Sequence, residues 1–256
     1  MGRQGDTAVD FWQRALPHAQ HGLARDYLSA LEVELLASLA LCGELEGPTR
    51  HLIVGGGRRI RPLVVLGACH ALDGNWRDAI RQAVAVEFIH TASLIHDDII
   101  DRSPVRRGLP AVHELFGPHT ALLAGDVLCF VAFEIAAQAP DVARLLARAC
   151  REMCIGEAMA ESLEAAEKKT ASLFAAAGEV GARMAGAPAS QVERMSTYGR
   201  LLGTAYQLRD DQLDGEAVAD PLPYAQAARG CAEALCASVP RDLLLELADV
   251  AVRRTQ

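Results

Sequence analysis

Residues 87–101 read EFIHTASLIHDDIID, an apolar stretch that ends in the acidic run DDIID at 97–101. On an α-helix, residues four apart share a face, so the carboxylates of Asp97 and Asp101 point the same way. Like charges at this spacing destabilise a helix by roughly 0.2–0.5 kcal/mol. A single run of this form is typical of a solvated helix end.

A second run of the same form ends residues 198–214, YGRLLGTAYQLRDDQLD. Asp210 and Asp214 repeat the spacing of the first run, with Asp211 between them. Two such runs, each closing an apolar helix, are harder to explain as solvated ends. They indicate that a positive group lies between them.

The rest of the chain is predicted to be helical. Apolar residues recur with helical periodicity from residue 10 onward, and no convincing alternating strand is found. Gly and Pro clusters separate the helices by short connections, which favours an all-α bundle forming a single domain over 1–256. The expected helices cover 8–22, 24–42, 60–72, 77–101, 118–138, 140–166, 168–186, 189–214, 221–237 and 240–254.

Composition excludes several classes of protein. The 256 residues are 51% hydrophobic with a formal net charge of −8, which favours a large aliphatic core and argues against a nucleic-acid binder. The seven cysteines form no C-x-x-C pair, as expected for buried thiols in a reducing compartment. No charge-free stretch of about 18 residues is present to span a membrane. We therefore expect a cytoplasmic protein.

The acidic runs predict a magnesium site. Carboxylates without nearby His or Cys suit hard cations with oxygen ligands, above all Mg²⁺. Mg²⁺ usually keeps waters and bridges protein carboxylates to substrate phosphates. The candidate metal ligands are Asp97, Asp98, Asp101, Asp210, Asp211 and Asp214.

Basic residues near these runs fit a phosphate ligand. Arg58, Arg59 and Arg61 follow three glycines at a helix start, where N–H groups and guanidinium forks bind phosphate oxygens. Arg106 and Arg107 lie one short loop beyond the first run. Each feature is weak alone, and together they indicate a diphosphate site. Lys169-Thr170 at a helix start and His90, two turns before Asp97, complete the set.

Five ordered stretches make the chain from about residue 55 to 214 resemble the trans-isoprenyl diphosphate synthases, the polyprenyl synthetase family. The long motifs that carry the resemblance are GGGRRIRP at 55–62, EFIHTASLIHDDIIDRSPVRRG at 87–108, LLAGDVL at 122–128, EKKTASLFAAAGEVGA at 167–182 and YGRLLGTAYQLRDDQLD at 198–214. The resemblance implies the isoprenoid synthase fold, a helical bundle around a central cavity.

The resemblance also implies roles for individual residues. Asp97 and Asp101 would hold two Mg²⁺ ions on the allylic diphosphate, and Asp210 a third, with Asp211 and Asp214 in support. Arg106 and Lys169 would clamp that diphosphate, and Gln207 and Thr170 would line the reacting centre. Isopentenyl diphosphate would be held by Arg58, Arg61, His90 and Arg107, where Arg58 stands at a position that is usually Lys in the family.

The expected reaction follows from charge. Mg²⁺ and the basic residues would stabilise the departing diphosphate, and the allylic cation would be attacked by the double bond of isopentenyl diphosphate. Bulky residues four and five positions before the first Asp limit the product in this family. Here these positions are the small Ser93 and Ala92, so a growing tail could reach Phe88, which suggests a long or medium product.

The region after Asp214 departs from the family. Family members usually run longer there and carry a Lys, a further Asp and closing helices, whereas no Lys follows Lys169 here. The stretch after 156–157 is also abbreviated, and Ala160 stands where Gln is common. Three hypotheses stay open: an elongating synthase, a class I terpene cyclase-like enzyme, and a non-catalytic partner subunit. The resemblance implies a homodimer or a heteromer.

Overall fold

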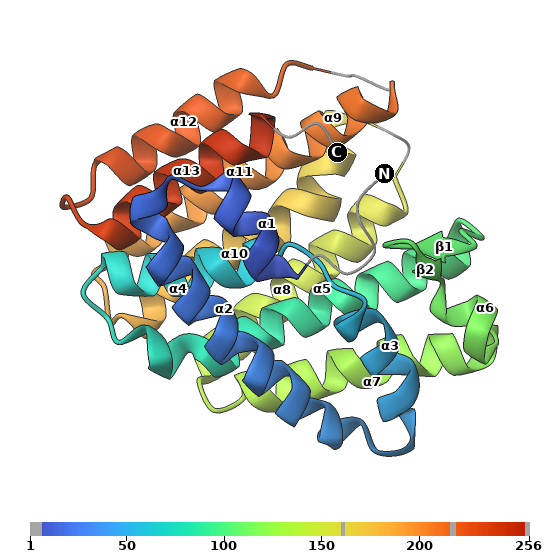
Figure 1. The fold of residues 1–256 in the computed structure, drawn as a ribbon. Coiled ribbons are helices and arrows are strands. Elements are labelled where there is room, and N and C mark those ends of the chain that lie inside the picture. The colour runs from blue at the N-terminus through green and yellow to red at the C-terminus, as the bar shows by residue number, and fades with distance from the viewer. Residues whose placement is uncertain (1–6, 160–161, 216–218, 254–256) are drawn as a thin grey trace.

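A computed structural model describes residues 7–159, 162–215 and 219–253. Helices dominate it, as predicted, and pack into the bundle drawn in Figure 1. The elements in chain order are α1 (Ala8–Ala15), α2 (His18–Ser38), η1 (Leu39–Leu45), α3 (Glu46–Val54), α4 (Ile60–Ala71), η2 (Trp76–Ala79), α5 (Ile80–Ile100), β1 (Val105–Arg106), β2 (Leu109–Pro110), α6 (Val112–Phe116), α7 (Pro118–Ala136), α8 (Pro140–Glu157), α9 (Leu163–Ala166), η3 (Glu167–Ala171), α10 (Ser172–Met184), α11 (Ala189–Asp214), α12 (Leu222–Glu233) and α13 (Val239–Arg253).

Helix α5 lies in the interior of the bundle and carries the first acidic run. It packs against α4 and α7, and α10 packs against α4 and α11 (Figure 1). A connected apolar cluster joins these helices and extends from Ala8 to Ala251. The acidic runs therefore end two helices that are held by one continuous core.

The first helix is shorter than predicted. We expected a helix over 8–22, but α1 ends at Ala15 and α2 begins at His18. Leu16 is extended (φ −98°, ψ 152°) because it precedes Pro17, and a residue before proline is pushed out of the helical region. The break thus falls at the proline rather than at 23.

Helix α3 was missed. The pair Gly47-Pro48 was read as a breaker, yet both residues lie in the first turn of this helix. Proline is tolerated there because the first N–H groups of a helix have no intrahelical partner. Gly43, with φ 57°, marks the true break.

A short hairpin follows α5, although no strand was predicted. Val105 pairs with Pro110, and Arg106 with Leu109. The two turn residues between them, Arg107 and Gly108, both have positive φ, which suits the twist of a two-residue hairpin. The hairpin projects beyond the C-terminal end of α5 (Figure 1).

The helix expected over 140–166 is interrupted near its C-terminal end. Helix α8 ends at Glu157, and the chain resumes as α9 followed by η3, a π-helical turn. Such turns are uncommon and occur frequently at functional sites. Ala160 lies outside the described residues.

Helix α7 is long and apolar enough to cross a membrane by length and composition alone. It has a mean hydropathy of 1.6, and 44% of the tested segment is buried. It also carries Asp126 and Glu134, so the prediction that no charge-free span is present holds for it. A core helix packed against α5 passes the same test.

Candidate active site

The first acidic run closes α5. Asp97 is half-buried in the last turn, and Asp101 is the exposed residue at the helix end, where its N–H donates to the carbonyl of Asp97 (2.8 Å). Burial raises the pKa of Asp97 to about 6, with Glu157 and Asp101 adding to the shift and Lys169 opposing it. Asp97 thus lies close to two other carboxylates, and a bound cation would reduce the repulsion among them.

Asp98 points elsewhere. Its side chain is 1% exposed, and its Oδ1 accepts a hydrogen bond from Nε of Arg106 at 2.8 Å. Arg106 belongs to β1, so this ion pair fastens the hairpin to α5. The two residues proposed as a metal ligand and a diphosphate clamp are therefore engaged with each other, while Asp97 and Asp101 occupy the other face.

Lys169 lies between the first run and α8. Its Nζ is 2.5 Å from Oε2 of Glu157, and Glu157, Asp97 and Asp101 raise the pKa of this amine against the opposing effect of its burial. The contact needs Gly156, because a Cβ there would come within 2.4 Å of the backbone N of Lys169. The sequence thus allows α8 to approach η3 closely enough to pair these side chains.

The second acidic run closes α11 and is joined to η3 by hydrogen bonds. Thr170 Oγ1 donates to Oε1 of Gln207 at 2.7 Å, and Gln207 Nε2 donates to Oδ1 of Asp211 at 2.8 Å. Asp214 is exposed at the end of the helix. Asp211 therefore orients Gln207, and the π-helical turn lies between the two runs: Lys169 interacts electrostatically with Asp97 and Asp101, and Thr170 is linked to Asp211 through Gln207.

Arg61, His90 and Arg107 form a basic cluster, and the buried carboxylate of Glu87 interacts electrostatically with its two arginines. Burial lowers the pKa of Arg61 and of Arg107 to about 10, although Glu87 raises both. Burial also lowers the pKa of His90 well below its ordinary value, and the neighbouring arginines lower it further. The positive charge gathered in this cluster favours an anionic ligand.

The cluster rests on the glycine loop. Arg107 donates to the carbonyls of Leu52 (3.2 Å) and Gly56. A Cβ at position 57 would lie 2.8 Å from Cζ of Arg107, and its φ of 132° is also unsuited to other residues. The guanidinium of Arg61 lies 4.2 Å from the ring centroid of Phe174. The loop that contains the three glycines therefore supports the side chain of Arg107 through its backbone.

Arg59 does not serve the site. It is 3% exposed and donates to Glu32 (2.8 Å), to Glu87 (2.8 Å) and to the carbonyl of Ile53 (2.6 Å). The expectation that all three arginines after the glycines bind phosphate is wrong for this one. Its left-handed backbone (φ 51°) turns it inward, where it links α2, α3 and α5.

Arg58 makes different contacts from Arg59. Its Nη1 donates to the hydroxyl of Tyr206 at 2.8 Å, and its guanidinium lies 4.9 Å from the ring centroid of Phe11. Trp12 Nε1 donates to its carbonyl at 2.5 Å. Arg58 is therefore held by α1 and α11, near Arg61 and the second acidic run.

The proposed chain-length residues line α5. Ser93 is half-buried one turn before Asp97 on the same face, and its Oγ donates to the carbonyl of His90 (2.8 Å). Ala92 and Phe88 are fully buried in the core. Ser93 is thus the better placed of the two small residues to face a substrate tail.

Within the described residues, no group of three or more His, Cys, Asp or Glu side chains is gathered closely enough to hold a metal by protein ligands alone. That suits Mg²⁺, which is held by one or two carboxylates and completed by substrate phosphates and water. Asp97, Asp101 and Asp210 are the oxygen donors that fit it. Residues 216–218, where the departure after Asp214 begins, lie outside the described part.

Sequence reasoning missed Glu87, Glu157, Phe174 and Tyr206. Glu87 and Tyr206 stand inside the motifs that end in the two runs, so their positions were visible but their roles were not. Their partners are Arg59 and Arg58, far away in the chain.

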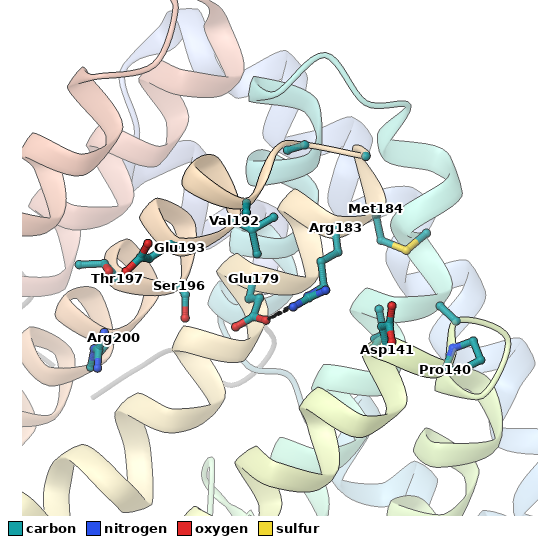
Figure 2. A pocket seen from close by; sticks show the side chains of 15 residues that line it. Pro140, Asp141, Glu179, Arg183, Met184, Val192, Glu193, Ser196, Thr197 and Arg200 are labelled. Atoms are coloured by element: carbon teal, nitrogen blue, oxygen red, sulfur yellow. Dashed lines mark hydrogen bonds and ion pairs between the residues drawn. The ribbon is translucent and has the colours of Figure 1, made fainter.

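A separate groove of about 750 Å³ lies between the start of α8, the end of α10 and the start of α11 (Figure 2). Its walls include the ion pair of Arg183 and Glu179, 2.7 Å apart, and the side chain of Val192. Val192 and Asp210 are separated by roughly 27 Å along α11, at 1.5 Å per residue. This groove is distinct from the residues predicted for the site.

Known proteins resemble this chain in sequence. Geranylgeranyl diphosphate synthase of Methanosarcina mazei is 41% identical over 190 residues, which cover 67% of this chain and 59% of that protein. Octaprenyl diphosphate synthase of Haemophilus influenzae is 38% identical over 178 residues, covering 64% of this chain and 54% of that protein. The chain thus spans less than two thirds of the length of these curated relatives.

Solved structures resemble it in fold. A polyprenyl synthase of Caulobacter crescentus, complexed with calcium and isoprenyl diphosphate, superposes with a TM-score of 0.86 at 28% identity and covers 93% of this chain and 98% of that one. The geranylgeranyl pyrophosphate synthetase of Geoglobus acetivorans gives 0.83 at 27% identity, with 90% and 99% covered. The sequence profile of the polyprenyl synthetase family matches residues 43–221. The chain therefore belongs to the polyprenyl synthetase family.

Proposed function

We propose that this chain is a trans-polyprenyl diphosphate synthase, which condenses isopentenyl diphosphate with an allylic prenyl diphosphate. The observation that carries the proposal is the basic cluster of Arg61, His90 and Arg107, whose cations are distinct from Lys169 and Arg106 beside the first acidic run. A cyclase needs one diphosphate site, whereas elongation needs two. Arg58, held at the same side by Tyr206, supports the second site.

Metal binding and binding of the allylic diphosphate are assigned to different residues. Asp97, Asp101 and Asp210 would hold Mg²⁺, since carboxylate oxygens are the ligands that this ion prefers, and three ions is the number that we propose from the family. When bound, Mg²⁺ supplies positive charge to the departing diphosphate. Lys169, fixed by Glu157, and Arg106, fixed by Asp98, bind the same allylic diphosphate.

The reaction breaks the bond between the allylic carbon and its diphosphate oxygen and forms a carbon–carbon bond with isopentenyl diphosphate. The cation produced then loses a proton to the released diphosphate. Gln207 and Thr170 orient the reacting centre, and the basic cluster holds the second diphosphate so that its double bond meets the allylic carbon. The apolar helices exclude water, which would otherwise capture the cation.

We also propose a cytoplasmic homodimer of single-domain chains. The seven cysteines are free thiols, as is typical of a reducing compartment. The exposed apolar side chains of Leu122, Leu123 and Phe130 share helix α7, a face that a second copy of the chain would cover. A heteromeric partner could occupy the same face.

A product assay tests the function. Purified protein is incubated with Mg²⁺, labelled isopentenyl diphosphate and farnesyl or geranylgeranyl diphosphate, and the products are sized. An extended prenyl diphosphate supports the proposal. A hydrocarbon formed without isopentenyl diphosphate would instead show a cyclase, and activity that requires a second chain would show a partner subunit.

A further inference from the structure

We propose that His96 is a positioning residue that anchors the last turn of α5 to helix α7 and so holds the carboxylates of Asp97 and Asp101 in place for the metal. The inference rests on the proposed function for the identity of the metal, but the contact between the two helices does not depend on it. The residues of α7 that take part belong to the motif LLAGDVL at 122–128, to which the expected reaction gives no role.

The side chain of His96 reaches the backbone of α7. Its Nε2 lies 3.2 Å from the carbonyl oxygen of Leu122 and 3.6 Å from Oδ1 of Asp126. A carbonyl and a carboxylate can only accept, so Nε2 carries the hydrogen and donates it. The imidazole therefore joins the end of α5 to the N-terminal half of α7.

Gly125 makes room for this contact. A Cβ at position 125 would lie 2.2 Å from Nε2 and 2.6 Å from Cδ2 of His96. Glycine destabilises the interior of a helix relative to alanine, so a buried glycine within α7 calls for a local cause. The close approach of the His96 ring to the helix backbone supplies one.

Asp97 lies between two anchored neighbours. His96, one residue before it, contacts α7, and Asp98, one residue after it, is paired with Arg106 of the hairpin. Successive residues of a helix point about 100° apart, so the two contacts leave α5 in different directions. Together they fix where the turn that carries Asp97 lies relative to the rest of the bundle.

The last turn of α5 needs such support. Asp97 and Asp101 repel one another on their shared face, and helix ends have few backbone bonds to resist this. The N–H of Ser103 donates to the carbonyl of Asp98 at 3.0 Å, but this bond lies within one segment and cannot fix the turn relative to α7. Metal ligands have to be held to within about 0.5 Å, which the contact of His96 with α7 would provide.

A purely structural role for His96 would have a different signature. Helices α5 and α7 already pack through the apolar core, which includes Ala121, Ala124 and Leu128 (Figure 1). One hydrogen bond from a side chain that is 29% exposed adds little to such an interface. We therefore expect its effect to be confined to the last turn, where Ile100 is already exposed.

Amide hydrogen exchange in the metal-free protein tests the anchor without any substrate. In His96→Ala, the amides of residues 98–101 should exchange about fivefold faster, while those of residues 84–89 in the interior of α5 stay within about twofold. His96→Gln should restore the wild-type rate, because its amide N–H can take the place of Nε2. The shorter His96→Asn should behave like His96→Ala. Equal acceleration along the whole of α5 would show a packing role, and unchanged exchange would show no anchor; either result overturns the inference.

Gly125→Ala is an independent test of the same contact. The new methyl group should displace the ring of His96 and reproduce the effect of His96→Ala. The double variant should be no worse than either single variant, because both changes remove one contact. Gly230→Ala in α12 is the matched control, since a Cβ there would meet nothing within 4 Å, and it should leave exchange in α5 unchanged. Effects that add in the double variant would contradict the inference.

The metal requirement of the reaction links the anchor to catalysis. His96→Ala should raise the Mg²⁺ concentration for half-maximal rate about fivefold and leave KM for isopentenyl diphosphate within about twofold, because other residues form the basic cluster. Faster exchange with an unchanged Mg²⁺ requirement would overturn the positioning role. A wild-type chain that forms no prenyl product would contradict the proposed function, whereas the exchange experiment would still decide whether His96 anchors the turn.

Discussion

At Asp97 the fold places a carboxylate among Glu157 and Asp101, and burial raises its pKa to about 6. Such a position costs free energy unless a cation is bound, because like charges repel most strongly where water is excluded. Asp98, one residue on, has its counter-charge built in through Arg106. Of these two neighbouring carboxylates, Asp98 is already paired with a cation of the protein, whereas Asp97 would be stabilised by a bound metal ion.

Asp97→Asn should therefore lower turnover by at least about a hundredfold, because charge stabilisation by a bound metal contributes several kcal/mol to the barrier. The measurement is the rate of product formation at saturating Mg²⁺. Asp141→Asn, at an exposed aspartate near the start of α8, is the control and should keep the wild-type rate. Near-normal turnover of Asp97→Asn would contradict the metal assignment.

His90 should make the protein sensitive to acid. Its pKa in the folded protein lies well below the ordinary 6.5. Below about pH 6.5 the imidazole is therefore protonated in the unfolded chain but stays neutral in the folded one. The free energy of unfolding should then fall as pH drops below about 6.5, by at most about 1.4 kcal/mol per pH unit.

His90→Gln should flatten that fall, because glutamine cannot take up the proton. Urea unfolding at about pH 7 and pH 5 measures the two slopes. Parallel declines in wild type and variant would show that His90 does not cause the loss.

At the scale of elements, η3 lies between the two acidic runs, near Asp97 and Asp101 through Lys169 and linked to Asp211 through Thr170 and Gln207. Its π-helical turn carries Lys169, which pairs with Glu157, and Thr170, which donates a hydrogen bond to Gln207. Gly156 permits the close approach of α8 on which this arrangement depends.

Gly156→Ala should displace η3, since the new Cβ would come within 2.4 Å of the backbone N of Lys169. A shift of this kind in a positioning element can reduce turnover about a hundredfold. Gly22→Ala in α2 is the control, because its Cβ would meet nothing within 4 Å. It should stabilise the protein by about 0.5–1 kcal/mol and leave turnover unchanged. Equal turnover of the two variants would contradict the role of η3.

Helix α5 should also set product length. Ser93→Phe, one turn before Asp97, should shorten the product because the ring would occupy the path of the tail. Products sized by chromatography give the answer, and an unchanged length would contradict the assignment. Ala92→Phe should shorten the product too, but Ala92 is fully buried, so we expect overpacking to cost about 1–3 kcal/mol of stability.

At the scale of the whole molecule, helix α7 presents apolar side chains on both sides. One side packs against α5 in the core, and the other exposes Phe130 (69%) and Leu122 (49%). Phe130→Asp should shift a dimer toward monomer in sedimentation experiments, because a charge would be buried on association. Val33→Asp, at an equally exposed residue (71%) of α2, should not. A wild-type monomer, or a dimer unaffected by Phe130→Asp, would contradict the proposed interface.

Local pattern was enough for much of the fold. The periodicity of α4, α7 and α11, bounded by Gly and Pro, predicted these helices with nearly their observed ends. It failed where one residue type can occur in two structural contexts, as at Pro48, which lies in the first turn of α3 instead of breaking a helix. The sequence cannot distinguish the two, because the choice depends on what the helix packs against.

The sequence by itself determined the helical class, the two acidic runs and the family, because these depend on residue types at short, fixed spacings. Only the tertiary structure decided which charges serve the site and which serve the core. Arg58 and Arg59 look alike in the chain, yet one reaches Tyr206 and the other Glu32 and Glu87. The physical reason is that a charge takes its role from its partners and its burial, and both are set by helices distant in sequence.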